Sequence, residues 1–138
     1  THTTAPGGSI SVTANQFDAA SGGQVRTTTF NAGQAGNINF AIAEGVNLTD
    51  GGTGLFADAA SGSAGAGGSI AVTTPGIQVS NGAAIAVDSR GRGPGGSINL
   101  NARSVNLTTG GAITATAASS GSGGNIDLQG EQLTATQG

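Results

Sequence analysis

Apolar and polar positions along the chain alternate in short segments, and these segments recur at a regular interval. A Gly-(Ser/Asn)-Ile triplet opens each recurrence, with spacings of 28, 32, 28 and 28 residues between successive copies. Self-similarity at such a period is typical of proteins built from stacked structural repeats. The five triplets begin at Gly8, Gly36, Gly68, Gly96 and Gly124.

Each copy contains three segments in which every second residue is apolar. In the third copy they cover 70–72, 77–79 and 85–87, and Pro75-Gly76 and Asn81-Gly82 separate them. Alternation with a period of two predicts β-strands, and Pro-Gly and Asn-Gly pairs predict turns. The pattern therefore predicts three short strands in each copy, with no helix between them.

Three short strands cannot bury their apolar face alone, but stacked copies bury it continuously. We therefore predict an all-β fold, a right-handed parallel β-helix (β-solenoid) with three short strands per coil of about 28 residues and about four and a half coils. At roughly 4.8 Å per coil, the rod would be about 20 Å long. The chain, 1–138, is expected to form a single domain, with 1–7 as a flexible or connecting segment.

The second copy has four extra residues, and they fall between the alternating segments. One precedes Val46, one precedes Leu55, and two lie in the loop 60–67. Insertions confined to turns are expected where the segments are structural and the turns are exposed. The inward positions take small aliphatic residues, together with Phe17 and Phe40.

The outward strand positions are expected to form columns along the rod. One of them is rich in amides, and stacked amides can hydrogen-bond from coil to coil. The first column is Ser11, Asn39, Ala71, Asn99 and Asp127; the second is Asp18, Asn47, Gln78, Asn106 and Thr134; the third is Arg26, Phe56, Ala86 and Thr114.

Composition and charge exclude several classes of function. The chain has four arginines, no lysine and a net charge of −3, so it lacks the basic surface that nucleic-acid binding needs. It has no cysteine, which excludes disulfides and thiolate metal sites. No apolar run reaches the length of a membrane span, so membrane insertion is not expected either.

The repeat also resembles a known family. The pattern GG(N/S)I-x-(V/L), then (V/L)-x-L, then GG-x-I-x-A and a Ser/Gly loop is clearest in 95–117 and 123–135. It resembles the repeats of filamentous haemagglutinin-like exoproteins of the cyanobacterial type, from Gly7 to the end of the chain. The resemblance implies a right-handed β-helix, export by a two-partner route, and an adhesive fibre that is released or held at the cell surface.

A polysaccharide-active enzyme or a carbohydrate-binding β-helix module is the alternative, since enzymes acting on polysaccharides also use β-helices and need clustered carboxylates. Asp58 and Asp88 occupy equivalent positions in neighbouring coils, and Arg90 and Arg92 leave the same loop as Asp88. They are weak candidates for a metal or sugar-contacting patch, and solvated loop charges are the expected outcome. We expect no catalytic residue and no cofactor, because the single histidine, His2, cannot complete a catalytic triad.

An ice-binding solenoid is a minor alternative, but the threonines of this chain fall in different registers of the coil. Phe30 and Phe56 occupy outward or loop positions, where they are candidates for contact with another molecule, as are Arg90 and Arg92. The expected function is a structural, non-enzymatic segment of an extracellular or cell-surface fibre, or a polymerising fibre subunit, with an adhesive or biofilm-matrix role. Expected partners are other copies, end to end or laterally, and surface glycans; the incomplete fifth coil could be completed by another copy.

Overall fold

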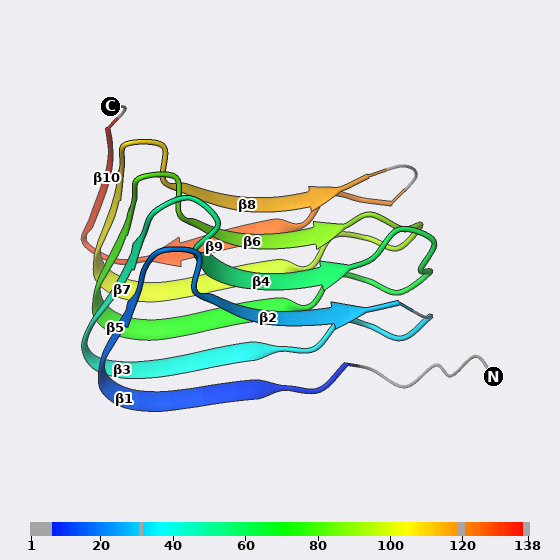
Figure 1. The fold of residues 1–138 in the computed structure, drawn as a ribbon, viewed down its shortest axis with the longest axis horizontal. Helices are drawn as coiled ribbons and strands as arrows, with labels where there is room; N and C mark the ends of the chain where they lie inside the picture. The colour runs from blue at the N-terminus through cyan, green and yellow to red at the C-terminus, as the bar shows by residue number, and fades with distance from the viewer. Residues whose placement is uncertain (1–6, 31, 119–120, 137–138) are drawn as a thin grey trace.

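The computed structural model describes residues 7–30, 32–118 and 121–136, and all regular structure among them is β-strand. The chain forms a right-handed parallel β-helix, as the repeat predicts (Figure 1). No helix in these ranges is long and apolar enough to cross a membrane. The strands are β1 (Ile10–Ala19), β2 (Gln24–Thr29), β3 (Ile38–Thr49), β4 (Gly54–Ala59), β5 (Ser69–Ser80), β6 (Ala84–Ser89), β7 (Ser97–Thr108), β8 (Ala112–Ala117), β9 (Asn125–Gln129) and β10 (Gln132–Thr136).

Two parallel sheets run along the rod and are built from equivalent strands of successive coils. The long strands form one sheet in the order β1-β3-β5-β7-β10, with β9 also paired to β7, and the short strands form the other in the order β2-β4-β6-β8. Figure 1 shows the coils rising in sequence order from β1. The register joins the five isoleucines of the triplets, which confirms the alignment of the repeats: Ile10, Ile38, Ile70, Ile98 and Ile126.

The first two predicted segments of a coil form one continuous strand that bends at the corner between them. In the first coil this strand is β1, and its pairing with β3 shifts by one residue between Ala14 and Gln16. The corner is thus a bend in which pairing with the neighbouring coil continues on both sides. Only in the last coil are the two segments separate strands, β9 and β10.

The extra residues of the second coil lie where the sequence predicts them. The offset between paired residues grows from 28 at Ala14↔Ile42 to 29 at Phe17↔Val46 and to 30 at Val25↔Leu55. The offset reaches 32 at Ile38↔Ile70, so the insertions are absorbed at the bend, at the corner before β4 and in the loop after it. Of the expected connecting segment 1–7, residues 1–6 and with them His2 lie outside the described residues, while the Gly7 N–H donates to Gln34 O at 2.8 Å.

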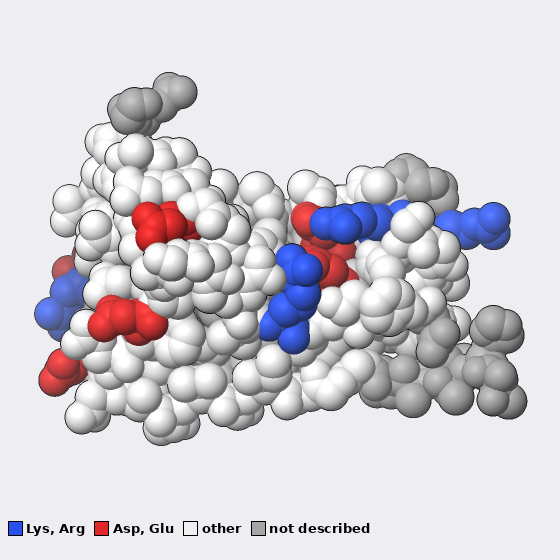
Figure 2. Space-filling model, viewed as in Figure 1, with Lys and Arg blue, Asp and Glu red and all other residues white. Residues whose placement is uncertain are grey.

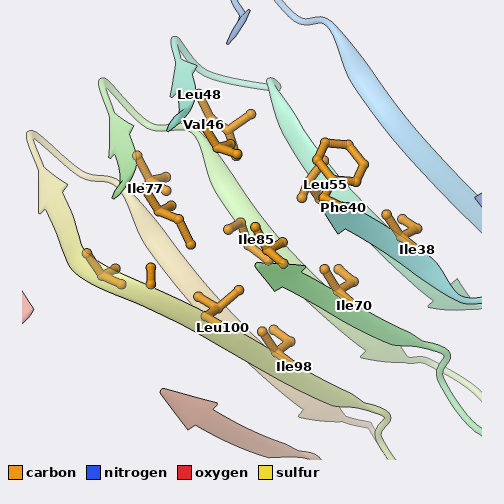
Figure 3. Packing of buried hydrophobic residues seen from close by; sticks show 14 of the residues in the cluster. Ile38, Phe40, Val46, Leu48, Leu55, Ile70, Ile77, Ile85, Ile98 and Leu100 are labelled. Carbon is orange, nitrogen blue, oxygen red and sulfur yellow. The ribbon is translucent and has the colours of Figure 1, made fainter. Parts of the chain in front are cut away.

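The core is a set of aliphatic columns that run along the axis (Figure 3). Burying one such side chain is worth about 1.5–3 kcal/mol. Phe17 and Phe40 both point inward, as predicted, with their rings edge to face at 4.6 Å between centroids and 71° between planes. Fully buried side chains are Ile38, Val46, Leu48, Leu55, Ile70, Val72, Ile77, Val79, Ile85, Val87, Ile98 and Leu100.

The glycine that opens four of the five triplets is required by close contact with the coil before it. A Cβ at Gly96 would collide with the carbonyl oxygen of Gly68, and a Cβ at Gly68 would collide with that of Gly36. At Gly8, in the first coil, a Cβ would meet nothing within 4 Å. The stacking of backbone on backbone therefore explains why the triplet begins with glycine.

We predict that Gly96→Ala destabilises the fold by about 1–3 kcal/mol, because the added methyl group must push two coils apart. Chemical denaturation with a two-state fit measures the change. Gly8→Ala is the matched control, since it makes the same substitution in the same column at a position where a Cβ meets no described atom within 4 Å. Equal losses in the two variants would contradict the stacking explanation.

A second column is made by the corner before three of the four short strands, β2, β6 and β8. Ser21, Asn81 and Thr109 have φ of 55°, 54° and 50°, and the glycine after each of them also has positive φ. The N–H two residues after each of them donates to the carbonyl of the residue before it, at 3.0–3.1 Å. Two central residues with positive φ define a type I′ turn, which favours Asn-Gly and is unfavourable for a β-branched residue.

Thr109→Asn is therefore expected to stabilise the protein by about 0.5–1 kcal/mol, because asparagine adopts positive φ more readily than threonine. The midpoint of thermal or denaturant unfolding measures the gain. Thr73→Asn, at an exposed strand position with ordinary φ, is the control and should show no gain. A gain of the same size at Thr73 would show that the turn is not its source.

Candidate functional site

Asp58 and Asp88 lie side by side on the outer face of the short-strand sheet. The β4–β6 register pairs Phe56 with Ala86 and Ala59 with Ser89, which places the two aspartates in adjacent coils. This adjacency was predicted from the sequence. Figure 2 shows the acidic and basic side chains of this region gathered together, apart from the other charges of that face.

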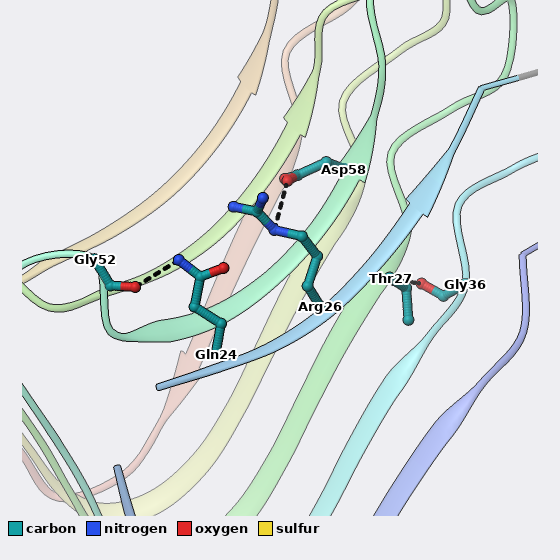
Figure 4. A network of polar contacts seen from close by, with 6 residues as sticks. All are labelled: Gln24, Arg26, Thr27, Gly36, Gly52 and Asp58. Carbon is teal, nitrogen blue, oxygen red and sulfur yellow. Dashed lines mark hydrogen bonds and ion pairs between the residues drawn. The ribbon is translucent and has the colours of Figure 1, made fainter. Parts of the chain in front are cut away.

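Arg26 of the first coil reaches across to Asp58 (Figure 4). Its Nε lies 3.5 Å from Asp58 Oδ2, and its Cζ lies 4.8 Å from the centre of the Phe56 ring. The Arg26 side chain is 44% exposed, so the ion pair is screened by water and is worth roughly 0–1 kcal/mol. The sequence analysis did not predict this contact, although the signal was present, since Arg26 precedes Phe56 in one column and Asp58 follows two residues later.

The carboxyl group of Asp58 is buried, with only 6% of the residue exposed. Burial raises the pKa of Asp58, and the neighbouring Asp88 raises it further. Arg26, Arg90 and the backbone N–H of Asp88 lower the pKa of Asp58, but the net direction is upward. Its Oδ1 atom is buried without a hydrogen-bond partner, which is a further penalty on the ionised form.

The contacts of the two aspartates among the described residues are a partly exposed ion pair and a hydrogen bond. Calcium takes about six to eight oxygen ligands, whereas no three His, Cys, Asp or Glu side chains come together within 7–30, 32–118 and 121–136. A glycosidase carboxyl must contact its substrate, and Asp58 lies under the Arg26 side chain. Asp88 is more exposed and accepts a hydrogen bond from the Thr116 hydroxyl.

The other predicted contact residues are not gathered into one site. Phe30 follows β2 and is 74% exposed, while Phe56 is half-buried beneath Arg26 and is less available to a partner. Arg90 and Arg92 have exposed side chains, and their backbone N–H groups donate to Ala59 O and Ser63 O of the preceding coil. Their loop is thus held to its neighbour by backbone hydrogen bonds.

Polar columns follow the predicted registers. In the amide-rich column, a hydrogen bond between successive coils joins Asn47 Nδ2 to Asp18 Oδ1 at 2.7 Å. Thr27 points inward and donates to Gly36 O, whereas Thr28 occupies the outward column of Asp58, so adjacent threonines do fall in different registers. The sequence analysis missed a corner column of hydroxyls, which directly follows the second segment in the second to the fifth coil: Thr49, Ser80, Thr108 and Thr136.

No protein-family model, curated protein or solved structure matches this chain. The likeness to haemagglutinin-like repeats therefore rests on the residues of the repeat itself. The arguments for function come from the stacked coils, the charged pair and the outward polar columns.

Asp58→Asn is expected to change how stability depends on pH. The pKa of Asp58 is raised in the folded state, so its contribution to stability is fully present below the unfolded pKa and is lost as pH rises through the folded pKa. The variant should lack this loss and be at least as stable as the parent chain at pH 7. Denaturation curves between pH 4 and pH 7 measure the effect.

The control is Asp127→Asn, at an exposed position of β9. It should keep the gain in stability on acidification that Asp58 provides. If Asp58→Asn retains the parent's full pH dependence, the raised pKa of Asp58 is contradicted.

Proposed function

We propose that this chain is a structural, non-enzymatic segment of an extended fibre, secreted or held at the cell surface, with a role in adhesion or biofilm matrix. The observation that carries the proposal is the stacking of successive coils in one parallel register, which makes apolar columns along the axis of the rod. The outermost described coil shows these columns uncovered. Ile126, Leu128 and Leu133 are 44%, 36% and 56% exposed. The residues below them in the same columns, Ile98, Leu100 and Val105, are 0%, 1% and 4% exposed.

These side chains become buried when another coil lies on them. The outer edges of β9 and β10 also carry backbone N–H and C=O groups that a further parallel strand would pair. A coil of a second copy would satisfy both requirements in the same parallel register that joins the described coils. End-to-end stacking of copies is therefore the arrangement that best buries these apolar side chains and pairs the free strand edges.

The mechanism of such a segment is mechanical and needs no chemical step. Backbone hydrogen bonds between coils run along the axis. Copies stacked end to end would therefore be joined by the same kind of hydrogen bond that joins successive coils within one chain. The chain has no lysine and few arginines, which limits cleavage by trypsin-like proteases. Outward Ser, Thr and Asn side chains give a hydrated surface for many weak contacts, and the resemblance to haemagglutinin-like repeats supports the same role and the same export to the cell surface.

Replacing Leu128 and Leu133 together by arginine is expected to abolish end-to-end association. Each change puts a charge into an apolar column that a stacked coil would bury, at a large free-energy penalty. Negative-stain electron microscopy and sedimentation velocity over a concentration series measure the association. The parent chain should form rods much longer than the roughly 20 Å of its own coils, and the variant should not.

The matched control is Asp127→Arg with Thr134→Arg, which adds two arginines to the same strands on their outward positions. It should still form rods. A parent chain that stays a short particle at every concentration, or a Leu128→Arg/Leu133→Arg variant that assembles like the parent, would contradict axial stacking.

A further inference from the structure

A polar hollow of about 280 Å³ lies on the outer face of the long-strand sheet, after the bend. Its floor is formed by two glycines in adjacent coils, Gly45 and Gly76, with Gln16 in the coil before them and Ser104 in the coil after them. At about 4.8 Å per coil, the distance from Gln16 to Ser104 is roughly 14 Å along the rod. The lining is Gln16, Glu44, Gly45, Asn47, Gly76, Ile77, Gln78, Ser104 and Asn106.

The backbone does not require glycine at these two positions. Neither has positive φ, and a Cβ at Gly45 or Gly76 would make only an ordinary contact at 3.5 Å, unlike the collision at Gly96. Glycine within a strand costs about 0.5–1 kcal/mol relative to alanine. Glycine inside a strand marks a bulge, a bend, or a place where a ligand or another backbone approaches closely. Gly45 and Gly76 lie at the bend, and their missing side chains leave the backbone there open to a ligand.

One wall of the hollow presents an amide in each of three successive coils. Asn47, Gln78 and Asn106 stack in register, so donors and acceptors repeat at the coil spacing. Asn47 also donates to Asp18, which orients its amide, while the Gln78 and Glu44 side chains are exposed. The only ionisable group in the lining is the carboxylate of Glu44.

We propose that this hollow binds a neutral oligosaccharide lying along the rod axis. Amides, a hydroxyl and one carboxylate match the hydroxyl groups of sugar rings, and the glycine floor lets a ring approach the sheet. Since the lining contains a carboxylate and no arginine, an anionic polysaccharide is disfavoured. No aromatic ring lines the hollow, so each site binds weakly, and a fibre would gain avidity by presenting many of them.

This site deepens the proposed adhesive role but does not depend on fibre formation. It can be tested on the Leu128→Arg/Leu133→Arg variant, whose edge lies outside the lining, so failure of the site and failure of axial stacking are separate results. The probes are cellohexaose and maltohexaose, with hexagalacturonate as the anionic counterpart. Binding is followed by amide chemical shifts in a titration of the ¹⁵N-labelled chain.

At least one neutral probe should cause saturable shifts confined to 44–47, 76–78 and 104–106, and hexagalacturonate should not. Gly76→Gln fills the hollow and should weaken binding by about tenfold or more. Gln78→Ala removes a wall amide without changing the floor and should weaken binding several-fold, so the test does not rely on one variant folding. Asn99→Ala, on the face before the bend, should bind like the parent.

Three results would overturn the proposal. The first is no saturable shift with either neutral probe, and the second is shifts centred outside the lining of the hollow. The third is equal binding by the parent chain and by the Gly76→Gln and Gln78→Ala variants. Binding of hexagalacturonate as strong as that of the neutral probes would also overturn it, because the carboxylate lining would then have no effect on selectivity.

Discussion

The structure depends on one constraint, the parallel register of backbone hydrogen bonds between successive coils. That register places each residue directly above its equivalent in the coil before, so a property of one position becomes a property of a column. Aliphatic columns form the core, and glycine columns let the backbones of successive coils pack in direct contact. Columns of positive φ make the corners. The pairing of Arg26 with Asp58 and the glycine floor of the hollow also follow from this register, because both join residues far apart in sequence but one coil apart in space.

Much of this fold could be predicted because two periods are present in the sequence at once. The period of two separates inward from outward positions, and the period of about 28 identifies which positions stack. Together they were sufficient to place Phe17 and Phe40 in the core and to locate the four extra residues of the second coil. They did not predict that the first two segments form one bent strand. Alternation stops at the bend, and whether hydrogen bonding continues through it is decided by contacts with the neighbouring coils.

The sequence likewise predicted which residues of the candidate site are neighbours, but not how their side chains pack. The adjacency of Asp58 and Asp88 is a matter of register and was expected. The burial of Asp58 depends on how far the Arg26 side chain extends from another coil and on how it packs over Phe56, which no spacing reveals. The hollow over Gly45 and Gly76 was missed for a related reason: it is formed by side chains that are absent, and sequence alone does not separate these glycines from those that the backbone requires.

Each coil contains far more length of chain than the distance by which it extends the rod. Each coil advances the rod by about 4.8 Å but contains about 28 residues, which would extend to roughly 90 Å if pulled straight. A coil peeled from the end of a loaded stack would therefore lengthen the molecule nearly twentyfold over that step and leave an equivalent coil as the new end. Under tension such a rod lengthens in repeated increments of one coil. The hydrogen bonds between coils therefore break in stages before any covalent bond of the backbone does.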